Sequence, residues 1–187
     1  MAAFAKQAMR MSLLRLLNEK PYQQITVKEI VEDCGLNRNT FYYHFHDLNE
    51  LLETTMDDRV QRIVRAHPTL ASVEACFDAL VDFVLENRQA MLHLYHSEQR
   101  PMMERYLWHI NEYLVKTYLA QLPYYRNLSE AERPVLVDYL KSLFFGMTMH
   151  WLENGLDADV QTRLQQLFTI RQHAFFQQMA LVRENEK

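Results

Sequence analysis

The sequence of 187 residues contains very little glycine or proline, with only 3 Gly and 5 Pro. Because these residues form most tight turns and interrupt helices, their scarcity argues against a sheet of many short strands and favours long helices. No G-x-S-x-G, Walker A or G-x-G-x-x-G motif occurs, and glycine is too scarce for a phosphate-binding loop. We therefore expect an all-α protein that is not an enzyme and holds no cofactor.

Cysteine is also scarce, since Cys34 and Cys76 are the only two and neither belongs to a C-x-x-C pair. Two reduced, buried thiols in a cytoplasmic protein are the expectation. His93 and His96 lie three residues apart, but no carboxylate motif accompanies them, so we predict no metal site. The sequence shows neither a signal peptide nor a run of 18 apolar residues, and we expect no association with a membrane.

An excess of positive charge is missing as well, because the formal net charge is −4. Residues 1–50 contain six basic and six acidic side chains, so the entire negative charge lies in residues 51–187. A body of this sign repels DNA while a neutral N-terminal part can approach it. If the protein binds DNA, specific binding with little non-specific background is expected.

The most informative stretch is TVKEIVEDCGLNRNTFYYHF, residues 26–45. Thr26 and Glu29 form a T-x-x-E capping box that begins one helix, and Gly35 suits the left-handed conformation that ends it. Asn37 then caps a second helix, RNTFYYHF. Two short helices joined by a tight glycine turn are typical of a helix-turn-helix, whose second helix enters the major groove.

The second helix has more polar and aromatic side chains than a purely buried helix needs. Phe41 and Phe45 are four residues apart and would tie it to a small core. The other side chains are of the kinds that hydrogen-bond to phosphates and base edges. These candidate DNA-contacting residues are Arg38, Asn39, Thr40, Tyr42, Tyr43 and His44. A surface helical hairpin without a ligand is the alternative.

Apolar residues at spacings of three and four predict helices through the rest of the chain. The stripe for a helix over residues 2–18 consists of Phe4, Ala8, Met11, Leu14 and Leu17. Asp47 and Glu50 form a second capping box, and Pro68 ends the helix that follows. Further helices are predicted from Ser72 to about His96 with a bend near Asn87, from Pro101 to about Gln121, from Ser129 to Asn154, and from about Asp159 to Val182.

These elements predict two domains. Residues 1–50 would form a three-helix DNA-binding domain, and a helix over residues 47–66 would link it to the body. Residues 67–187 would form a helical ligand-binding and dimerisation domain. Apolar residues on the helices 134–154 and 160–182 exceed one face, so we expect both to pack against their symmetry mates as a four-helix bundle.

Aromatic and methionine side chains of the predicted body could line a cavity for a small apolar or aromatic effector. The candidates are Phe77, Tyr95, Trp108, Tyr113, Phe144, Met149 and Trp151. For any single one of them, simple filling of the core is the better interpretation.

The run ITVKEIVEDCGLNRNTFYYHFHDLNELL resembles the TetR/AcrR family of bacterial transcriptional regulators. In that family an I-A-x-x-A-G-V-S turn precedes a T-x-Y-x-H-F helix and an S-K-E-x-L helix start. The matching residues here are Ile30, Gly35, Leu36, Asn37, Thr40, Tyr42, His44, Phe45, Asp47 and Leu51. The resemblance covers about residues 5–60. The C-terminal part is similar in type to regulators like the dihydroxyacetone-operon activator.

This resemblance implies a homodimer that binds a palindromic double-stranded DNA operator as a ligand-responsive repressor. An activator, or a regulator controlled by a protein partner without a small-molecule ligand, is the alternative. The helix 47–66 would act as a lever between an effector in the body and the DNA-binding helices.

Carried over to this sequence, the resemblance places Thr26 and Lys28 against the DNA backbone. Tyr42 and His44 would grip phosphate, and the residues facing bases or phosphates would be Arg38, Asn39, Thr40 and Tyr43. Leu48 stands where the family commonly has a phosphate-binding lysine, with Asn49 as a weak substitute. We therefore expect lower DNA affinity or a smaller salt dependence than is typical.

Overall fold

The structure, a computed structural model, describes residues 2–160, 162–163 and 165–166. The chain divides into two units, residues 1–156 and 157–187. Within the described residues all regular structure is helical, which confirms the predicted all-α fold. The elements are α1 (Ala2–Glu19), η1 (Tyr22–Gln24), α2 (Val27–Asp33), α3 (Arg38–His44), α4 (Leu48–Ala66), η2 (Leu70–Ser72), α5 (Val73–Glu86), α6 (Arg88–Tyr95), α7 (Arg100–Leu119), α8 (Pro123–Asn127) and α9 (Glu132–Glu153).

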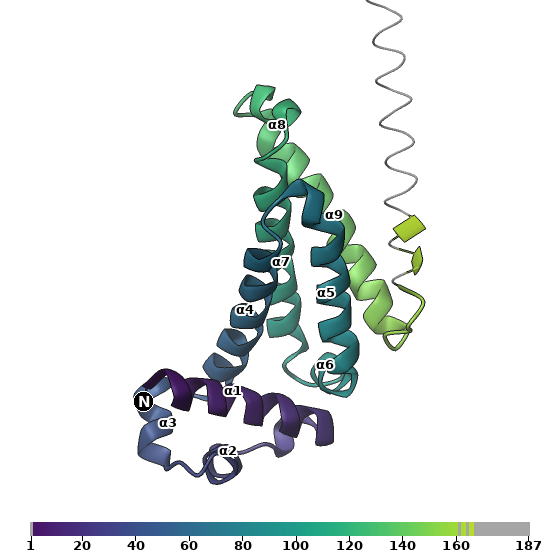
Figure 1. Ribbon diagram of the computed structural model, residues 1–187. Coiled ribbons are helices and arrows are strands. Elements are labelled where there is room, and N and C mark those ends of the chain that lie inside the picture. The colour runs from purple at the N-terminus through teal and green to yellow at the C-terminus, as the bar shows by residue number, and fades with distance from the viewer. Residues whose placement is uncertain (1, 161, 164, 167–187) are drawn as a thin grey trace, which may run out of the picture. The chain divides into compact units, whose positions relative to one another are not determined.

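Helices α1, α2 and α3 gather at one end of the first unit, and α4 leads away from them along the other helices (Figure 1). The C-terminal half of α1 packs against α6, while α7 packs against α4 and α9. The predicted domain boundary at Pro68 lies inside the unit of residues 1–156. The division of the chain into a DNA-binding and a ligand-binding domain remains a prediction. The predicted helix from Asp159 to Val182 lies mostly outside the described residues.

The helix-turn-helix forms through the local signals that the sequence contains. Thr26 Oγ1 accepts a hydrogen bond from the Glu29 backbone N–H at 3.3 Å, and the Glu29 carboxylate accepts one from the Thr26 N–H at 2.9 Å. Gly35 has a φ of +63°, where a side chain would cause strain. The Leu36 N–H then donates to the Val31 carbonyl oxygen at 2.8 Å, which closes α2 in a Schellman motif.

The predicted ends of the other helices agree closely with the structure. Asp47 caps α4 by accepting a hydrogen bond from the Glu50 N–H at 2.9 Å, and α4 ends just before His67-Pro68. A break at Asn87 separates α5 from α6, and a proline occupies the first turn of α7. Helix α8 was not predicted, because the predicted helices leave the residues between about Gln121 and Ser129 as a connection, and Pro123 is compatible with the end of a helix. It is also well suited to begin a helix.

The predicted apolar stripe of α1 is partly wrong. The Phe4 side chain is 78% exposed and that of Met11 is 62% exposed, whereas Met9 and Leu13 are completely buried. Helix α1 carries a second apolar stripe at spacings of three and four, and this is the buried one: Ala5, Met9, Leu13 and Leu16. The buried side is the one that faces both α4 and α6, and this choice depends on tertiary packing that the local spacing cannot reveal.

Candidate nucleic-acid interface

Helix α3 is anchored from beneath by two phenylalanines. Phe41 is fully buried and Phe45 is nearly so, with ring centroids 5.8 Å apart. At its start, the Asn37 side-chain oxygen accepts hydrogen bonds from the Thr40 N–H at 2.9 Å and from the Thr40 hydroxyl at 3.2 Å. The helix is therefore fixed by its core side and by its N-cap, as the sequence predicted.

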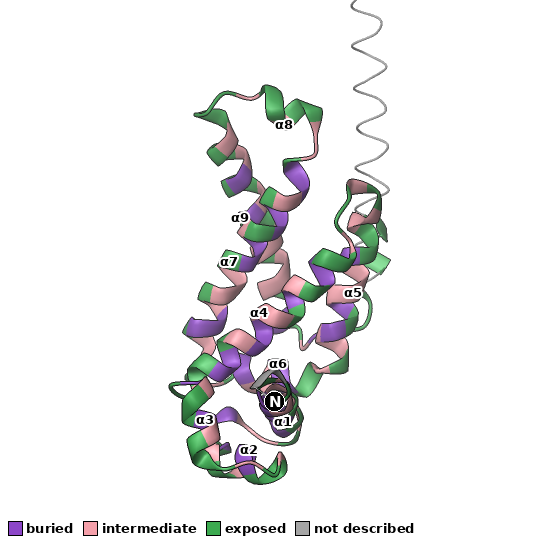
Figure 2. Ribbon diagram, turned by 60° about the vertical axis from the view of Figure 1, so that its left-hand side comes forward, coloured by how far each residue is buried: buried purple, intermediate pink, exposed green. Residues whose placement is uncertain are grey.

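The predicted DNA-contacting side chains of α3 lie on its solvent side. Tyr42 is 58% exposed and Tyr43 is 80% exposed, so neither side chain is buried in the core. Arg38 and Asn39 are exposed as well, whereas Thr40 and His44 are half-buried. Figure 2 shows exposed residues over much of α2 and α3. Two large tyrosines left in water on a rigid seven-residue helix are better explained by a binding surface than by folding.

The two predicted backbone contacts on α2 are exposed but already engaged. The Thr26 hydroxyl takes part in the capping box with Glu29. The Lys28 ammonium lies 3.8 Å from the Glu32 carboxylate in an exposed ion pair. An ion pair of this kind is weak, so phosphate could compete for Lys28. These assignments, like those on α3, remain predictions.

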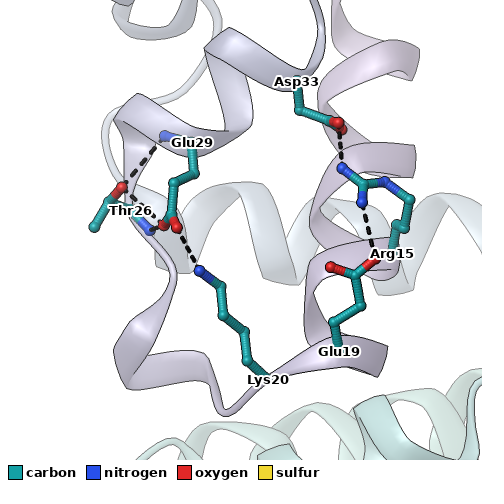
Figure 3. A network of polar contacts seen from close by, with 6 residues as sticks. All are labelled: Arg15, Glu19, Lys20, Thr26, Glu29 and Asp33. Atoms are coloured by element: carbon teal, nitrogen blue, oxygen red, sulfur yellow. Dashed lines mark hydrogen bonds and ion pairs between the residues drawn. The ribbon is translucent and has the colours of Figure 1, made fainter.

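A network of charged side chains fastens α2 to α1 at both ends (Figure 3). Arg15 on α1 pairs with Asp33 at the end of α2, and Lys20 pairs with Glu29 in the first turn of α2. The Arg15 hydrogen bond holds the pKa of Asp33 below its usual value, and the Lys20 hydrogen bond does the same for the pKa of Glu29. These contacts orient the first helix of the motif.

Sequence reasoning did not identify this network. Arg15 and Asp33 are 18 residues apart, so no local spacing pairs them. The network leaves the net charge of residues 1–50 at zero, because both members of each ion pair already belong to that count.

Tyr22 and Asn49 form a contact beside the start of α4. The buried Tyr22 hydroxyl donates a hydrogen bond to the Asn49 side-chain oxygen at 2.7 Å. Burial, and then the charge of Asp47, raise the pKa of Tyr22 to about 12, so the hydroxyl keeps its proton at neutral pH. The amide oxygen of Asn49 is thereby occupied, while the residue is exposed and Leu48 beside it is half-buried. Asn49 is thus the polar side chain beside Leu48, the position where the resembling family commonly has a phosphate-binding lysine.

The predicted effector residues are distributed over four helices. The rings of Phe77 on α5 and Phe144 on α9 lie 5.3 Å apart, so the structure brings these two together. Trp108 on α7 packs instead against Phe145, and Tyr95 on α6 is buried. Tyr113 is 40% exposed on α7, and Met149 is half-buried on α9.

A cleft of about 270 Å³ lies between α7, α8 and α9, and none of the predicted effector residues lines it. Five of its eight lining residues are charged, and the lining consists of Glu112, Lys116, Tyr125, Glu130, Arg133, Pro134, Val137 and Asp138. Among the described residues, no three His, Cys, Asp or Glu side chains gather in a way that could hold a metal ion. No described helix combines the length and the apolar character needed to cross a membrane.

Known proteins resemble this chain in both sequence and fold. The uncharacterised HTH-type transcriptional regulator YxbF of Bacillus subtilis (strain 168) is 22% identical over 179 residues, which are 89% of this chain. The chain spans only 44% of the length of that relative.

Among solved structures, the dihydroxyacetone kinase operon activator DhaS superposes with a TM-score of 0.71 at 15% identity, covering 89% of this chain and 95% of that chain. The two share a fold, as the sequence resemblance suggested. NalD, the secondary repressor of the MexAB-OprM multidrug efflux pump in Pseudomonas aeruginosa, gives a TM-score of 0.45 at 17% identity, covering 90% of this chain and 97% of that chain. That similarity is too low to support an inference.

Two family models match the chain, and both describe regulators rather than enzymes. A transcriptional regulator C-terminal region matches residues 72–173, which are more than half of the sequence. The model for bacterial regulatory proteins of the tetR family matches residues 13–55, which include the capped helix-turn-helix described above. The family that residues 26–51 suggested is therefore confirmed, and the chain belongs to the tetR family of bacterial regulatory proteins.

Proposed function

We propose that this chain is a sequence-specific, cytoplasmic DNA-binding regulator, a repressor that binds a palindromic operator as a dimer. The observation that carries the proposal is the surface of α3. Its polar and aromatic side chains are exposed, while Phe41, Phe45 and the Asn37 cap hold the helix rigidly. Membership of a family of bacterial regulatory proteins supports the same role.

In the proposed complex, α3 lies in the major groove of double-stranded DNA. Arg38 and Asn39 occupy its first turn, the part of a recognition helix that reads base edges. Tyr42 and His44 would position the helix on phosphates. Two copies related by a two-fold axis would bind half-sites whose centres are about 34–36 Å apart, or a multiple of that distance.

The dimer interface is proposed on α9. Val135, Tyr139 and Leu143 are all exposed and follow one another at intervals of four residues, so they form one apolar ridge. Gly146 continues the ridge, and nothing lies within 4 Å of where its Cβ would be. A second α9 could approach closely at that glycine. The helix 160–182, the other proposed half of the interface, lies mostly outside the described residues.

Control by a small apolar or aromatic effector is proposed through α4. Residues 45–47 separate its start from the end of α3, and His67, the residue after its last turn, accepts a hydrogen bond from Tyr118 on α7. An effector could bind beside Phe77 and Phe144, the predicted pair that the structure brings together. The effector would release the operator only if it binds one position of α4 more tightly than the other. To shift the two positions from a ratio of 1:99 to 99:1, the difference in binding free energy must be about 5.5 kcal/mol.

The decisive experiment is the selection of bound DNA from a random pool with the full chain. We expect enrichment of an inverted repeat, which the double variant Thr40→Ala, Tyr42→Ala no longer retains. Tyr124→Ala is the matched control, because Tyr124 is equally exposed but lies on α8. A failure of the wild type to enrich any sequence would refute the proposal. Repeating the selection with candidate metabolites, or with protein fractions, distinguishes an effector from a protein partner.

A further inference from the structure

The C-terminal end of α1 and helix α6 satisfy each other's backbone groups. His93 on α6 donates from Nδ1 to the Leu17 carbonyl oxygen on α1 at 2.7 Å. In the opposite direction, the Asn18 side-chain oxygen accepts a hydrogen bond from the Ala90 backbone N–H at 3.2 Å. Each helix therefore provides a cap for the other.

The sequence explains why α1 needs this cap. A helical carbonyl normally accepts from the N–H four residues later, and for Leu17 that residue is Pro21, which has no N–H. The Leu17 carbonyl would remain without a partner on its own helix. The His93 imidazole replaces the missing donor from a position 76 residues further along the chain.

Helix α6 has a matching deficiency at its start. Its own N-cap residue, Asn87, makes no side-chain capping bond. The Asn87 side chain instead donates to the Phe83 carbonyl oxygen at 2.9 Å and accepts from the Asn18 side-chain amide at 3.1 Å. Asn18 thus acts as the N-cap of α6 from another helix, although it precedes α6 by about 70 residues.

The apolar contacts around these bonds make the joint rigid. Leu13 and Leu17 on α1 are fully buried, and so are Ala90 and Leu94 on α6. Sliding α6 along α1 would leave the Ala90 N–H, the Leu17 carbonyl and the Asn18 side-chain oxygen without these partners. Such groups are costly when buried, so the two helices should move together.

We propose that this reciprocally capped joint carries the state of the body to the DNA-reading helices through α1, in addition to the connection through α4. Helix α6 contacts α5, α7 and α9, whereas α2 is held by Arg15 on α1 and by Lys20, the residue after α1. In Figure 1, α1 separates α6 from α2 and α3. A displacement of the body at α6 is therefore passed through α1 to the helix-turn-helix. The inference rests on the proposed function, because it concerns the control of DNA binding.

Linkage makes the joint testable without a known effector, because coupling between two sites is reciprocal. If the joint transmits, operator binding at α3 must also stabilise α6. Hydrogen–deuterium exchange of peptides covering residues 86–97 is measured with and without the operator selected from the random pool. In the wild type we expect exchange to slow about five-fold or more on DNA binding.

Two variants break the joint from opposite sides, and each has a matched control. Asn18→Ala removes the cap of α6, and Asn111→Ala removes a buried asparagine that bonds only within its own helix. His93→Phe removes the cap of α1, and His109→Phe removes a histidine that also faces only a carbonyl of its own helix. Since the two joint variants act on different residues, either one suffices if the other fails to fold.

In both joint variants, we expect operator binding to protect α2, α3 and α4 but no longer α6. In both controls, protection of α6 should persist. If the wild type binds its operator without protecting α6, or if the joint variants keep that protection, the inference is overturned while the proposed function stands. If the wild type binds no DNA from the pool, the proposed function fails, and the inference fails with it.

Discussion

The Tyr118 hydroxyl on α7 donates a hydrogen bond to the carbonyl oxygen of His67, 2.6 Å away, at the residue that ends α4. Gln121 supports the same junction by donating to the Pro68 carbonyl oxygen at 2.8 Å. The body end of the proposed lever is therefore held by Tyr118 on α7 and by Gln121, which follows α7. A motion of α7 should reach α4 through this junction.

Removing the Tyr118 hydroxyl should loosen the lever without unfolding the protein. Tyr118→Phe keeps the buried ring but leaves the His67 carbonyl without that partner, so stability should fall by about 1–3 kcal/mol in urea unfolding. Operator affinity should change as well, because the α4 equilibrium shifts. Tyr113→Phe on the same helix is the control, since Tyr113 is partly exposed. An unchanged operator affinity in Tyr118→Phe would argue against control through this junction.

Different residues of α3 should affect DNA binding in different ways. Tyr42→Phe loses a phosphate contact, so it should weaken all DNA sequences alike. Asn39→Ala and Arg38→Ala should change the preference at particular base pairs, each by about 1–3 kcal/mol. Anisotropy titrations with the operator and with single-base variants separate the two effects. If Tyr42→Phe changed the base preference, the assigned roles would be incorrect.

The start of α4 should give DNA binding an unusually small salt dependence. Leu48→Lys restores the charge that the family commonly places there, so the slope of log K against log salt should steepen by about 0.9. Asn49→Ala should lower affinity but leave the slope unchanged, because a neutral amide releases no counterion. A change of slope in Asn49→Ala, or none in Leu48→Lys, would show that this end of α4 does not meet phosphate.

How much the sequence predicts depends on how far apart the interacting residues are. Gly35, Asn37 and the Thr26 capping box act within five residues, so the sequence alone defines both helices of the motif. The Arg15–Asp33 pair cannot be recognised in the same way, because it requires the packing of α1 on α2. Helix α1 has two apolar stripes at helical spacing, and the packing of α1 on α4 and α6 decides which of them is buried.

The candidate site follows the same rule. The exposed residues of α3 were predictable because their types are unusual for a buried helix. The effector residues were not equally predictable, since Phe77 and Trp108 face different partners although both are aromatic and belong to the body. Composition identifies residues suitable for a cavity, but only the packing of four helices decides which of them meet.

Acid should weaken the attachment of α2 to α1. The pKa values of Asp33 and Glu29 are lowered in the folded chain, so their contribution to stability is complete above their ordinary pKa values. It is lost as the pH falls through the lowered values. Thermal melts should therefore show a decline below roughly pH 4, and the double variant Asp33→Asn, Glu29→Gln should show a shallower decline. Glu53→Gln is the control, because Glu53 is exposed on α4 outside this network. An equally steep decline in the double variant would assign the acid sensitivity to other groups.

Charge placed on the ridge of α9 should separate the proposed dimer. Tyr139 and Leu143 are exposed neighbours on that ridge, so Tyr139→Glu, Leu143→Glu places two carboxylates against their copies in the partner. An uncompensated buried charge costs about 3 kcal/mol or more, so the dimer dissociation constant should rise at least about a hundred-fold. Sedimentation at micromolar concentration measures it, with Phe4→Glu as the control because Phe4 is exposed on α1 instead. The monomeric variant should also lose the palindromic operator, since one copy reads only a half-site. A wild type that sediments as a stable monomer, or a ridge variant that remains dimeric, would exclude α9 as the interface.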